Sequence, residues 1–360
     1  MAEKPDAPLR HDSGSAGEDR ANELPKAGDG ESGETVTRIV DIPTVKSDFV
    51  GVYLLKSKTF SETKAGAPYL RLRLSDCTGE IDAFVWENVG STDSAISQGQ
   101  VIKLKGRLNI FQQRPNVKVL HIRSALDNEY DVSEIVDSPK THLDDLLAVV
   151  TESIERVADP DYRALLEKIF SDKKFVARFK TAPGAKAIHH AYPGGLLEHT
   201  VSLLRLASSV LEIYGDLDAD LLITSCILHD IGKMDEYNSD LAVERTTEGR
   251  LLGHIVLGLL QLQRYVEKFD SFPSEKWRKL LHALISHHGS LEWGSPQVPM
   301  TLEAIALHYI DNLDAKLGQF RALVEKHKDP NFKGFTTYDR FLERWVYFGD
   351  SAGKTGDERK

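Results

Sequence analysis

The chain has 360 residues, enough for two ordinary domains, and 41% of them are hydrophobic, as is usual for globular proteins. It contains no apolar run of about 18 residues, so we expect no transmembrane helix and no membrane partner, and its polar N-terminus does not predict a secretory signal. The formal net charge of −10 argues against non-specific binding of duplex DNA by the whole surface.

The N-terminal third changes character near residue 35. Residues 1–34 are mostly small, polar or acidic, so we expect a disordered tail. From 35 to 128 apolar and polar residues alternate, as in Leu70, Leu72 and Leu74, and the pattern recurs at 81–86, 101–111 and 117–125. Short strands with glycine turns over roughly 90 residues predict a small β-barrel.

The same alternation assigns a set of side chains to the outside of this barrel. Aromatic rings beside arginines suit base stacking and backbone contact in single strands, and basic residues without neighbouring acids could form a groove for phosphates. In the alternative interpretation, an aromatic such as Trp86 closes the barrel or contacts the helical domain, and the basic segment is a solvated hairpin. The candidates are Tyr69, Arg71, Arg73, Phe84 and Trp86, followed by Lys103, Lys105, Arg107, Arg114, Lys118 and Arg123.

From residue 141 to 325 apolar residues recur every three or four positions, which predicts an all-α bundle. Residues 326–360 form a C-terminal extension whose polar end we expect to be disordered. The two cysteines, Cys77 and Cys226, show no disulfide pattern, which fits a reducing cytoplasm.

Histidines and aspartates are spread over five of the predicted helices. Imidazole and carboxylate groups bind divalent metals, and an unpaired carboxylate such as Asp311 in an apolar helix would be costly. Taken alone, the pair His229–Asp230 could also be a solvated helix end. Together the residues predict a metal cluster, a common device for hydrolysing phosphate esters. The candidate ligands are His199, His229, Asp230, His254, His287, His288 and Asp311.

Several strings carry a resemblance to a known family. The runs IHHAYPGGLLEHTVSLLRLA (188–207), LLITSCILHDIGKMDEY (221–237), LLGHI (251–255), SHHG (286–289) and LHYIDNLDAK (307–316) resemble the HD-domain phosphohydrolases. More closely, they resemble the YhaM-type 3′–5′ exoribonucleases, over roughly residues 36–325. The resemblance implies an N-terminal OB-fold β-barrel followed by an all-α HD-domain helical bundle.

The resemblance also implies roles for the ligands. His199, His229, Asp230 and Asp311 would form a first metal site, and His254, His287 and His288 a second, with Asp230 bridging them. Which of His287 and His288 ligates directly stays open. Asp314 competes with Asp311, but the family pattern favours Asp311 and leaves Asp314 as an ordinary exposed residue. Gly195 stands where three-metal members have a Glu, which argues against a third ion.

Around the ligands, Lys233 is a candidate for contact with the substrate phosphate. For His190, which shares a loop with His189, the resemblance implies contact with the phosphate or with a metal ligand, and the alternative is a surface or structural histidine pair. For Lys233 the alternative is a lysine placed at a helix C-terminus by the helix dipole. His282 and His308 are expected to be structural. The resemblance favours Mn, with Fe, Co or Zn as alternatives, and two ions per site.

The resulting expectation is a metal-dependent 3′–5′ exonuclease of single-stranded RNA, with single-stranded DNA as a second candidate substrate, that releases nucleoside 5′-monophosphates. One alternative is an HD phosphohydrolase acting on free or cyclic nucleotides. Another is a nucleic-acid-binding accessory protein with a vestigial HD site. Family analogy makes a homo-oligomer plausible.

Overall fold

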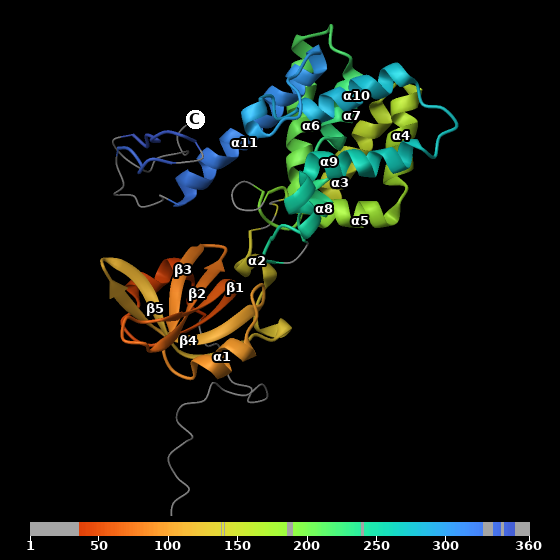
Figure 1. The fold of residues 1–360 in the computed structure, drawn as a ribbon. Helices are drawn as coiled ribbons and strands as arrows, with labels where there is room; N and C mark the ends of the chain where they lie inside the picture. Colours follow the sequence, from red (N-terminus) through yellow and green to blue (C-terminus); the bar gives the residue numbers. More distant parts are fainter. Residues whose placement is uncertain are drawn as a thin grey trace, which may run out of the picture.

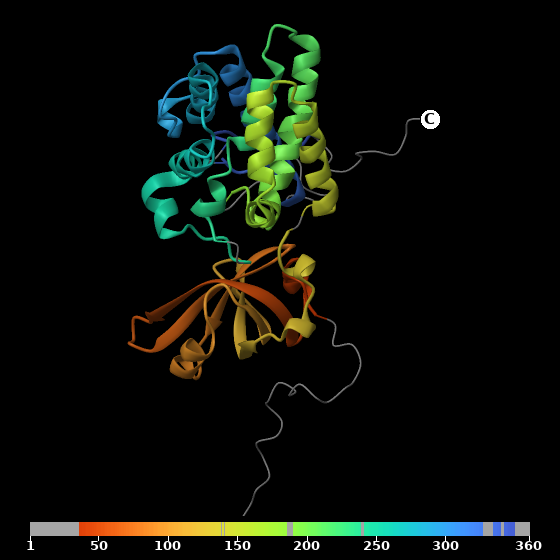
Figure 2. The same ribbon diagram turned by 90° about the vertical axis from the view of Figure 1, so that its right-hand side faces the viewer.

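A β-barrel and a helical domain make up the molecule (Figures 1 and 2). The computed structural model describes residues 36–137, 139, 141–185, 190–238, 241–326, 334–339 and 342–349. The predicted N-terminal tail and the end of the C-terminal extension lie outside these residues.

Five strands close the barrel in the order β1-β2-β3-β5-β4. β3 pairs with β5 in parallel and the other pairs are antiparallel. This topology and the small closed barrel are those of the OB-fold, which confirms the predicted fold class. The strands are β1 (Phe49–Glu62), β2 (Pro68–Asp76), β3 (Gly79–Val85), β4 (Val101–Phe111) and β5 (Arg114–Ser124), with η1 (Ile39–Thr44) before them and α1 (Val89–Ala95) between β3 and β4.

The alternation in the sequence orients the strands. Leu70, Leu72 and Leu74 of β2 are fully buried inside the barrel, and Ile81 and Val85 of β3 face the same core. Because successive side chains of a strand point to opposite faces, the intervening polar and aromatic residues lie outside.

The helical domain follows a short connection that contains η2 (Asp127–Glu129) and α2 (Val132–Ile135). α6 and α7 form its centre: α6 contacts α3, α5, α7 and α11, and α7 also contacts α10. The helices are α3 (Leu143–Arg156), α4 (Pro160–Phe170), α5 (Lys173–Thr181), α6 (Gly195–Ile213), α7 (Ala219–Leu228), α8 (Lys233–Glu236), α9 (Thr247–Val266), α10 (Ser274–Ser286) and α11 (Leu302–Lys326), with η3 (Leu291–Trp293) before α11.

Side-chain caps fix where several of these helices begin. The carboxylates of Asp159, Asp172 and Asp218 accept backbone N–H bonds at the starts of α4, α5 and α7. α9 is interrupted at Gly253, whose φ of 71° is not helical. His254 therefore opens the second part of that helix. None of the described helices combines the length and apolar character needed to cross a membrane.

A small structure in the C-terminal extension was not predicted. Residues 334–339 and 342–349 pair through the bridges Phe335↔Tyr347 and Asp339↔Arg344. The aromatic side chains of Phe335, Tyr338, Trp345 and Tyr347 are exposed. The prediction that the end of the extension is disordered concerns residues outside the described ones.

Candidate metal centre

All the predicted ligands converge in the helical domain, and the first group gathers around His199 of α6. Its Nε2 atom lies 3.3 Å from Nε2 of His229 and 3.2 Å from Oδ1 of Asp311. His199 and His229 are almost completely buried, at 5% and 3% exposure. These three side chains, from α6, the end of α7 and α11, could hold one metal ion.

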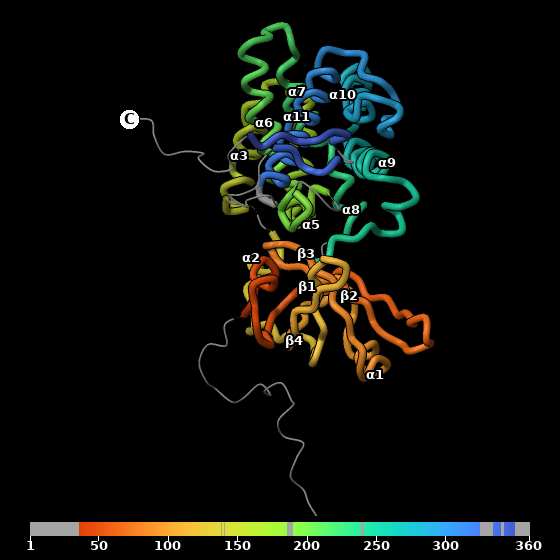
Figure 3. The backbone as a smooth tube through the Cα atoms, turned by 90° about the vertical axis from the view of Figure 1, so that its left-hand side faces the viewer, coloured from red at the N-terminus to blue at the C-terminus, as the bar shows by residue number. Residues whose placement is uncertain are grey.

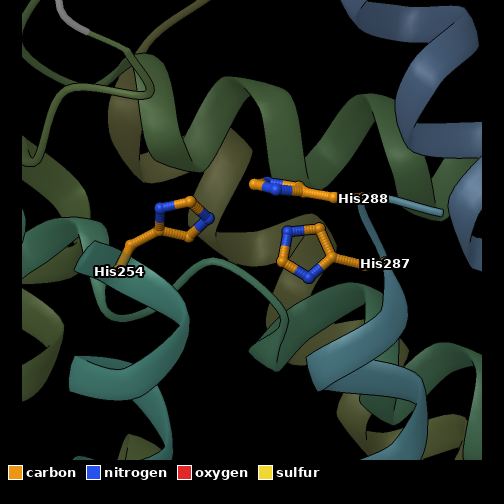
Figure 4. A group of neighbouring side chains, drawn as sticks. All are labelled: His254, His287 and His288. Atoms are coloured by element: carbon orange, nitrogen blue, oxygen red, sulfur yellow. The ribbon is translucent and has the colours of Figure 1, made fainter. Parts of the chain in front are cut away.

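A second group is formed by His254, His287 and His288. One ring nitrogen from each lies within 4.8 Å of the others. Figure 4 shows the three imidazoles turned toward a common space, His254 from α9 and the other two from the end of α10. Because His287 and His288 both face this space, both remain candidates for direct ligation.

Asp230 lies between the two groups. Its Oδ2 is 3.1 Å from Nε2 of His229 and 3.7 Å from Nε2 of His199. Its Oδ1 is 3.4 Å from Nε2 of His254 and 3.8 Å from Nε2 of His287. One carboxylate oxygen therefore faces each group, the arrangement that a bridging ligand requires.

The backbone fixes which ring nitrogens face inward. His229 Nδ1 lies 2.9 Å from the Cys226 carbonyl oxygen, and His287 Nδ1 lies 2.7 Å from that of Leu284. His288 Nδ1 is 3.1 Å from the carbonyl oxygen of Trp293. Since a carbonyl can only accept, each Nδ1 carries the proton and each Nε2 keeps its lone pair for the centre.

The donor atoms fit a metal ion. Asp230 Oδ1 and His254 Nε2 are both buried and have no hydrogen-bond partner. Burial raises the pKa of Asp230, but His229 and Lys233 outweigh it and hold the pKa well below its ordinary value, so the side chain is a carboxylate. A buried carboxylate oxygen facing an imidazole lone pair is costly unless a cation lies between them.

Glycines let the helix ends approach this closely. Gly232 lies two residues after Asp230, and a Cβ there would lie 1.9 Å from the carbonyl oxygen of His254. No other residue therefore fits at position 232 without moving α9. Gly289 has a φ of 80°, and a Cβ there would lie 2.2 Å from the His308 ring. His308 in turn donates from Nδ1 to the His287 carbonyl oxygen at 2.8 Å. His308 is thus structural, as predicted, and braces the end of α10.

Asp314 is not the exposed residue that we predicted. Its side chain is only 13% exposed, and its Oδ2 lies 2.8 Å from Nδ1 of His199. Burial lowers the pKa of His199, but Asp311 and Asp314 outweigh it and raise the pKa to about 9. Asp311, which the family pattern favours as the ligand, lies on the Nε2 side of His199, and Asp314 lies on the Nδ1 side, because α11 brings both carboxylates to α6.

Lys233 and His190 also lie at the centre. Lys233 Nζ is 2.5 Å from Asp230 Oδ2, so its charge is paired with the bridging carboxylate. His190 is buried, with Nδ1 3.1 Å from the Tyr192 hydroxyl and Nε2 3.5 Å from Asp314 Oδ2, which places it behind His199. Contact of either with a phosphate stays a prediction, and His189 lies outside the described residues. His282 accepts the Met300 N–H at 2.8 Å, a structural role as expected.

Comparisons with known proteins decide the family. The profile of the HD domain matches residues 196–316, which contain every predicted ligand. The 3′–5′ exoribonuclease YhaM of Bacillus velezensis is 34% identical over 277 residues, covering 77% of this chain and 87% of that protein. YhaM of Bacillus subtilis is 34% identical over 276 residues, covering 76% and 87%. This chain belongs to the YhaM family of 3′–5′ exoribonucleases.

Among solved structures, the second OB-fold domain of replication protein A from Methanococcus maripaludis matches at 17% identity and a TM-score of 0.19, covering 24% of this chain and 89% of that one.

The membership in the YhaM family, with its HD domain, makes the converging histidines and aspartates a divalent-metal site.

On the barrel of this YhaM-family protein, the predicted aromatic side chains form one cluster. The rings of Tyr69 and Trp86 stack with centroids 4.9 Å apart, and Phe84 lies 6.2 Å from Trp86. Trp86 is 45% exposed, so it neither closes the barrel nor lies buried against the helical domain. Register places Arg71 opposite Phe84, at the edge of the cluster.

The predicted basic residues fall into separate places. Register aligns Phe84 with Lys118 and Lys118 with Arg107, which extends the outer face of the barrel. Lys103 instead joins Glu129 at 3.2 Å. Acidic residues from other segments also pair with Arg107 (Asp48, 2.6 Å) and Lys118 (Glu87, 3.9 Å).

Acidic partners reach the arginines of the aromatic face as well. Arg71 contacts Asp82 at 2.9 Å, and Arg73 contacts Glu80 at 3.0 Å and Asp82 at 3.2 Å. Within the described part of the chain, Lys105 and Arg114 have no carboxylate within ion-pair distance. The basic segment from Lys103 to Arg123 contains no acidic residue, but acidic residues from elsewhere in the chain therefore neutralise most of its positive charge in the folded barrel.

Proposed function

We propose that the protein hydrolyses single-stranded RNA from its 3′ end and releases nucleoside 5′-monophosphates, with single-stranded DNA as a second substrate. The observation that carries this proposal is Asp230, which presents one oxygen to each of two groups of imidazoles. Such a carboxylate suits a pair of ions, and a pair of ions suits phosphodiester hydrolysis.

The residues prepare the site for two divalent ions. His199, His229 and Asp311 would hold one and His254, His287 and His288 the other, with Asp230 shared. When bound, the ions supply an activated water and neutralise charge that develops on the phosphate. An imidazole-rich set favours Mn, Fe, Co or Zn over Mg, and we favour Mn. Gly195 offers no carboxylate for a third ion.

Lys233 has a defined part in this arrangement. Burial lowers its pKa, but Asp230 outweighs burial and raises it, so the amine stays protonated. Its cation lies beside the shared carboxylate at 2.5 Å, where a phosphate oxygen that approached Asp230 would meet it. His190 acts from behind His199, next to Asp314.

The barrel would hold the strand. Tyr69, Phe84 and Trp86 offer a stacked aromatic surface, and base–aromatic stacking does not require a particular sequence. Arg71 and Arg73 line a hollow on the same face with Ser57, Thr59 and Asp82. A barrel of this kind favours a polymer over a free or cyclic nucleotide, the main alternative substrate.

The test is digestion of a 5′-labelled single-stranded RNA with Mn or with EDTA. We expect a ladder that shortens from the 3′ end, is absent with EDTA, and is reduced on the order of 10³-fold, about 4 kcal/mol, in Asp230→Ala. Asp235→Ala is the matched control, because Asp235 lies five residues on and pairs with Arg178 rather than with the centre. An intact strand with metal bound would redirect the search to free nucleotides; failure to bind metal would favour a vestigial site.

Two further expectations go with this proposal. A cytoplasmic location follows from the cysteine usage of the sequence. A homo-oligomer follows from family analogy, and light scattering during gel filtration would measure it.

A further inference from the structure

The chain between α8 and α9 leaves the helical domain and reaches the barrel (Figures 1 and 3). We call residues 237–238 and 241–245 the barrel-facing loop. Its two sides pair: Tyr237 bridges Arg245, and the Asn238 N–H donates to the Glu244 carbonyl oxygen at 3.0 Å. The loop is therefore braced at its base.

The far end of this loop is anchored on the barrel by apolar contacts. Ala242 is 8% exposed and joins a buried cluster with Val52 and Leu54 of β1 and Val101 of β4, and Leu241 packs against the same cluster. Gly99 lies close by, since a Cβ there would be 3.8 Å from that of Ala242. A residue of the helical domain thus completes a small core on the barrel.

The base of the loop carries Glu236, which is 2% exposed. Its Oε2 lies 3.1 Å from Nδ1 of His254, and its Oε1 lies 3.3 Å from Nε of Arg245. Its backbone is held as tightly: the carbonyl oxygen accepts the Thr246 N–H at 2.9 Å, and a Cβ at Gly249 would lie 2.2 Å from that oxygen. Glu236 therefore cannot shift without the loop and the start of α9.

His254 lies against this carboxylate at ion-pair distance. His229, His287 and His288 are oriented by backbone carbonyl oxygens, whereas the Nδ1 atom of His254 faces the side chain of Glu236. His254 also follows the non-helical Gly253, so the regular turn of a helix does not precede it. A carboxylate beside Nδ1 keeps the proton there and leaves the Nε2 lone pair directed at Asp230, 3.4 Å away.

We propose that Glu236 is a positioning residue for His254, and that the barrel, through Leu241 and Ala242, holds Glu236 in place. The barrel is then a structural part of the second metal group as well as a surface for the strand. The inference rests on the proposed two-ion function. One consequence is that removing the barrel weakens metal binding. Activity on a small phosphodiester, which needs no barrel for its own binding, should then fall as well.

The first experiment measures Mn²⁺ binding to the full-length protein by calorimetry, with the number of ions checked by elemental analysis. We expect Glu236→Ala to lower the affinity for one of the two ions by about 10- to 100-fold and to leave the affinity for the other unchanged. Glu236→Gln, which keeps an acceptor oxygen, should recover part of the loss. Glu248→Gln is the matched control, since Glu248 is exposed on the first turn of α9. Circular dichroism verifies that each variant is folded.

The second experiment tests the route through the barrel. Ala242→Gln places a larger polar side chain in the apolar cluster without changing charge. We expect it to lower the affinity for the same ion. Combined with Glu236→Ala it should cost nothing further, because both changes act through one contact. Additive losses, or unchanged Mn²⁺ affinity in Ala242→Gln, would overturn the role of the barrel.

The controls separate this inference from the proposed function. If the unaltered protein binds two ions and shortens RNA while Glu236→Ala binds both ions as tightly, the positioning role is wrong and the nuclease proposal stands. If the unaltered protein shortens RNA but binds fewer than two ions, the two-ion arrangement and the positioning role are wrong, and the nuclease proposal stands; if it neither binds metal nor shortens RNA, both proposals are wrong.

Discussion

The metal centre and the outer face of the barrel both concentrate charged side chains, but these side chains are buried and incompletely paired in the centre, whereas on the barrel they are exposed and mostly paired. In the centre, Asp230 is buried among imidazoles, and one of its oxygens has no hydrogen-bond partner. On the barrel, Arg71 and Arg73 are 57% and 42% exposed, and each already pairs with Asp82. A buried, unsatisfied cluster requires an ion; an exposed, paired surface is stable alone and can exchange partners when a strand arrives.

The largest effect in this comparison is expected from Asp314→Asn, because an amide can donate to His199 Nδ1 and reverse the position of its proton. We expect Mn²⁺ affinity to fall about 10- to 100-fold, with activity recovered at high Mn²⁺. Calorimetry and activity measured against Mn²⁺ concentration check this. Asp270→Asn, at an exposed aspartate, is the control. A fall in kcat that excess Mn²⁺ does not reverse would contradict a role in holding His199.

On the barrel the corresponding change is Trp86→Ala. Removal of this exposed ring from the aromatic cluster should cost about 1–3 kcal/mol of affinity for single-stranded RNA, seen as a raised KM with kcat unchanged. Phe60→Ala is the control, since Phe60 is 53% exposed on the same barrel but outside the cluster. Equal losses in the two variants would mean that stacking at Trp86 is not specific.

The difference between the regions also explains what the sequence could predict. The candidate ligands could be predicted because His or Asp inside an apolar helix needs a partner, and because the strings around them resemble a known family. Asp314 could not be placed, because only the contact of α11 with α6 decides which carboxylate faces which nitrogen of His199. Glu236 was missed for the same reason: its partner lies across the start of α9.

On the barrel, alternation correctly predicted the aromatic face, because strand geometry is local. The same alternation places Asp82 on the face of Phe84, where it pairs with Arg71. The partners of the basic segment were not predictable. Asp48, Glu87 and Glu129 come from other parts of the chain and meet the segment only after the barrel closes.

A smaller effect, on stability, is expected from Glu129→Gln. Arg123 binds this carboxylate through two nitrogens, both at 2.7 Å, and lowers its pKa from 4.5 to about 2 although burial opposes the change. Since the folded pKa lies below the unfolded one, the stabilisation is present above pH 4.5 and is lost as the pH falls toward 2. The variant should lose about 1–2 kcal/mol at neutral pH, and the difference should shrink in acid.

Urea unfolding across this pH range measures the difference. Glu87→Gln is the control, because Glu87 is 83% exposed and only 3.9 Å from Lys118, so we expect almost no change. A loss in Glu129→Gln that stayed constant down to the acid limit would mean that the carboxylate charge contributes nothing.

The smallest expected effect concerns the salt dependence of RNA binding, and it separates paired from unpaired cations on the barrel. Lys105→Ala should reduce the slope of log K against log salt by about 0.7, the share of one phosphate contact in a single strand. Arg71→Ala should reduce it by less, because Asp82 keeps its charge beside any phosphate that Arg71 binds. Fluorescence anisotropy with a labelled oligonucleotide at several salt concentrations gives both slopes. If Arg71→Ala matched Lys105→Ala, the ion pair with Asp82 would not persist in solution, and the barrel would carry a more positive binding face than its folded contacts indicate.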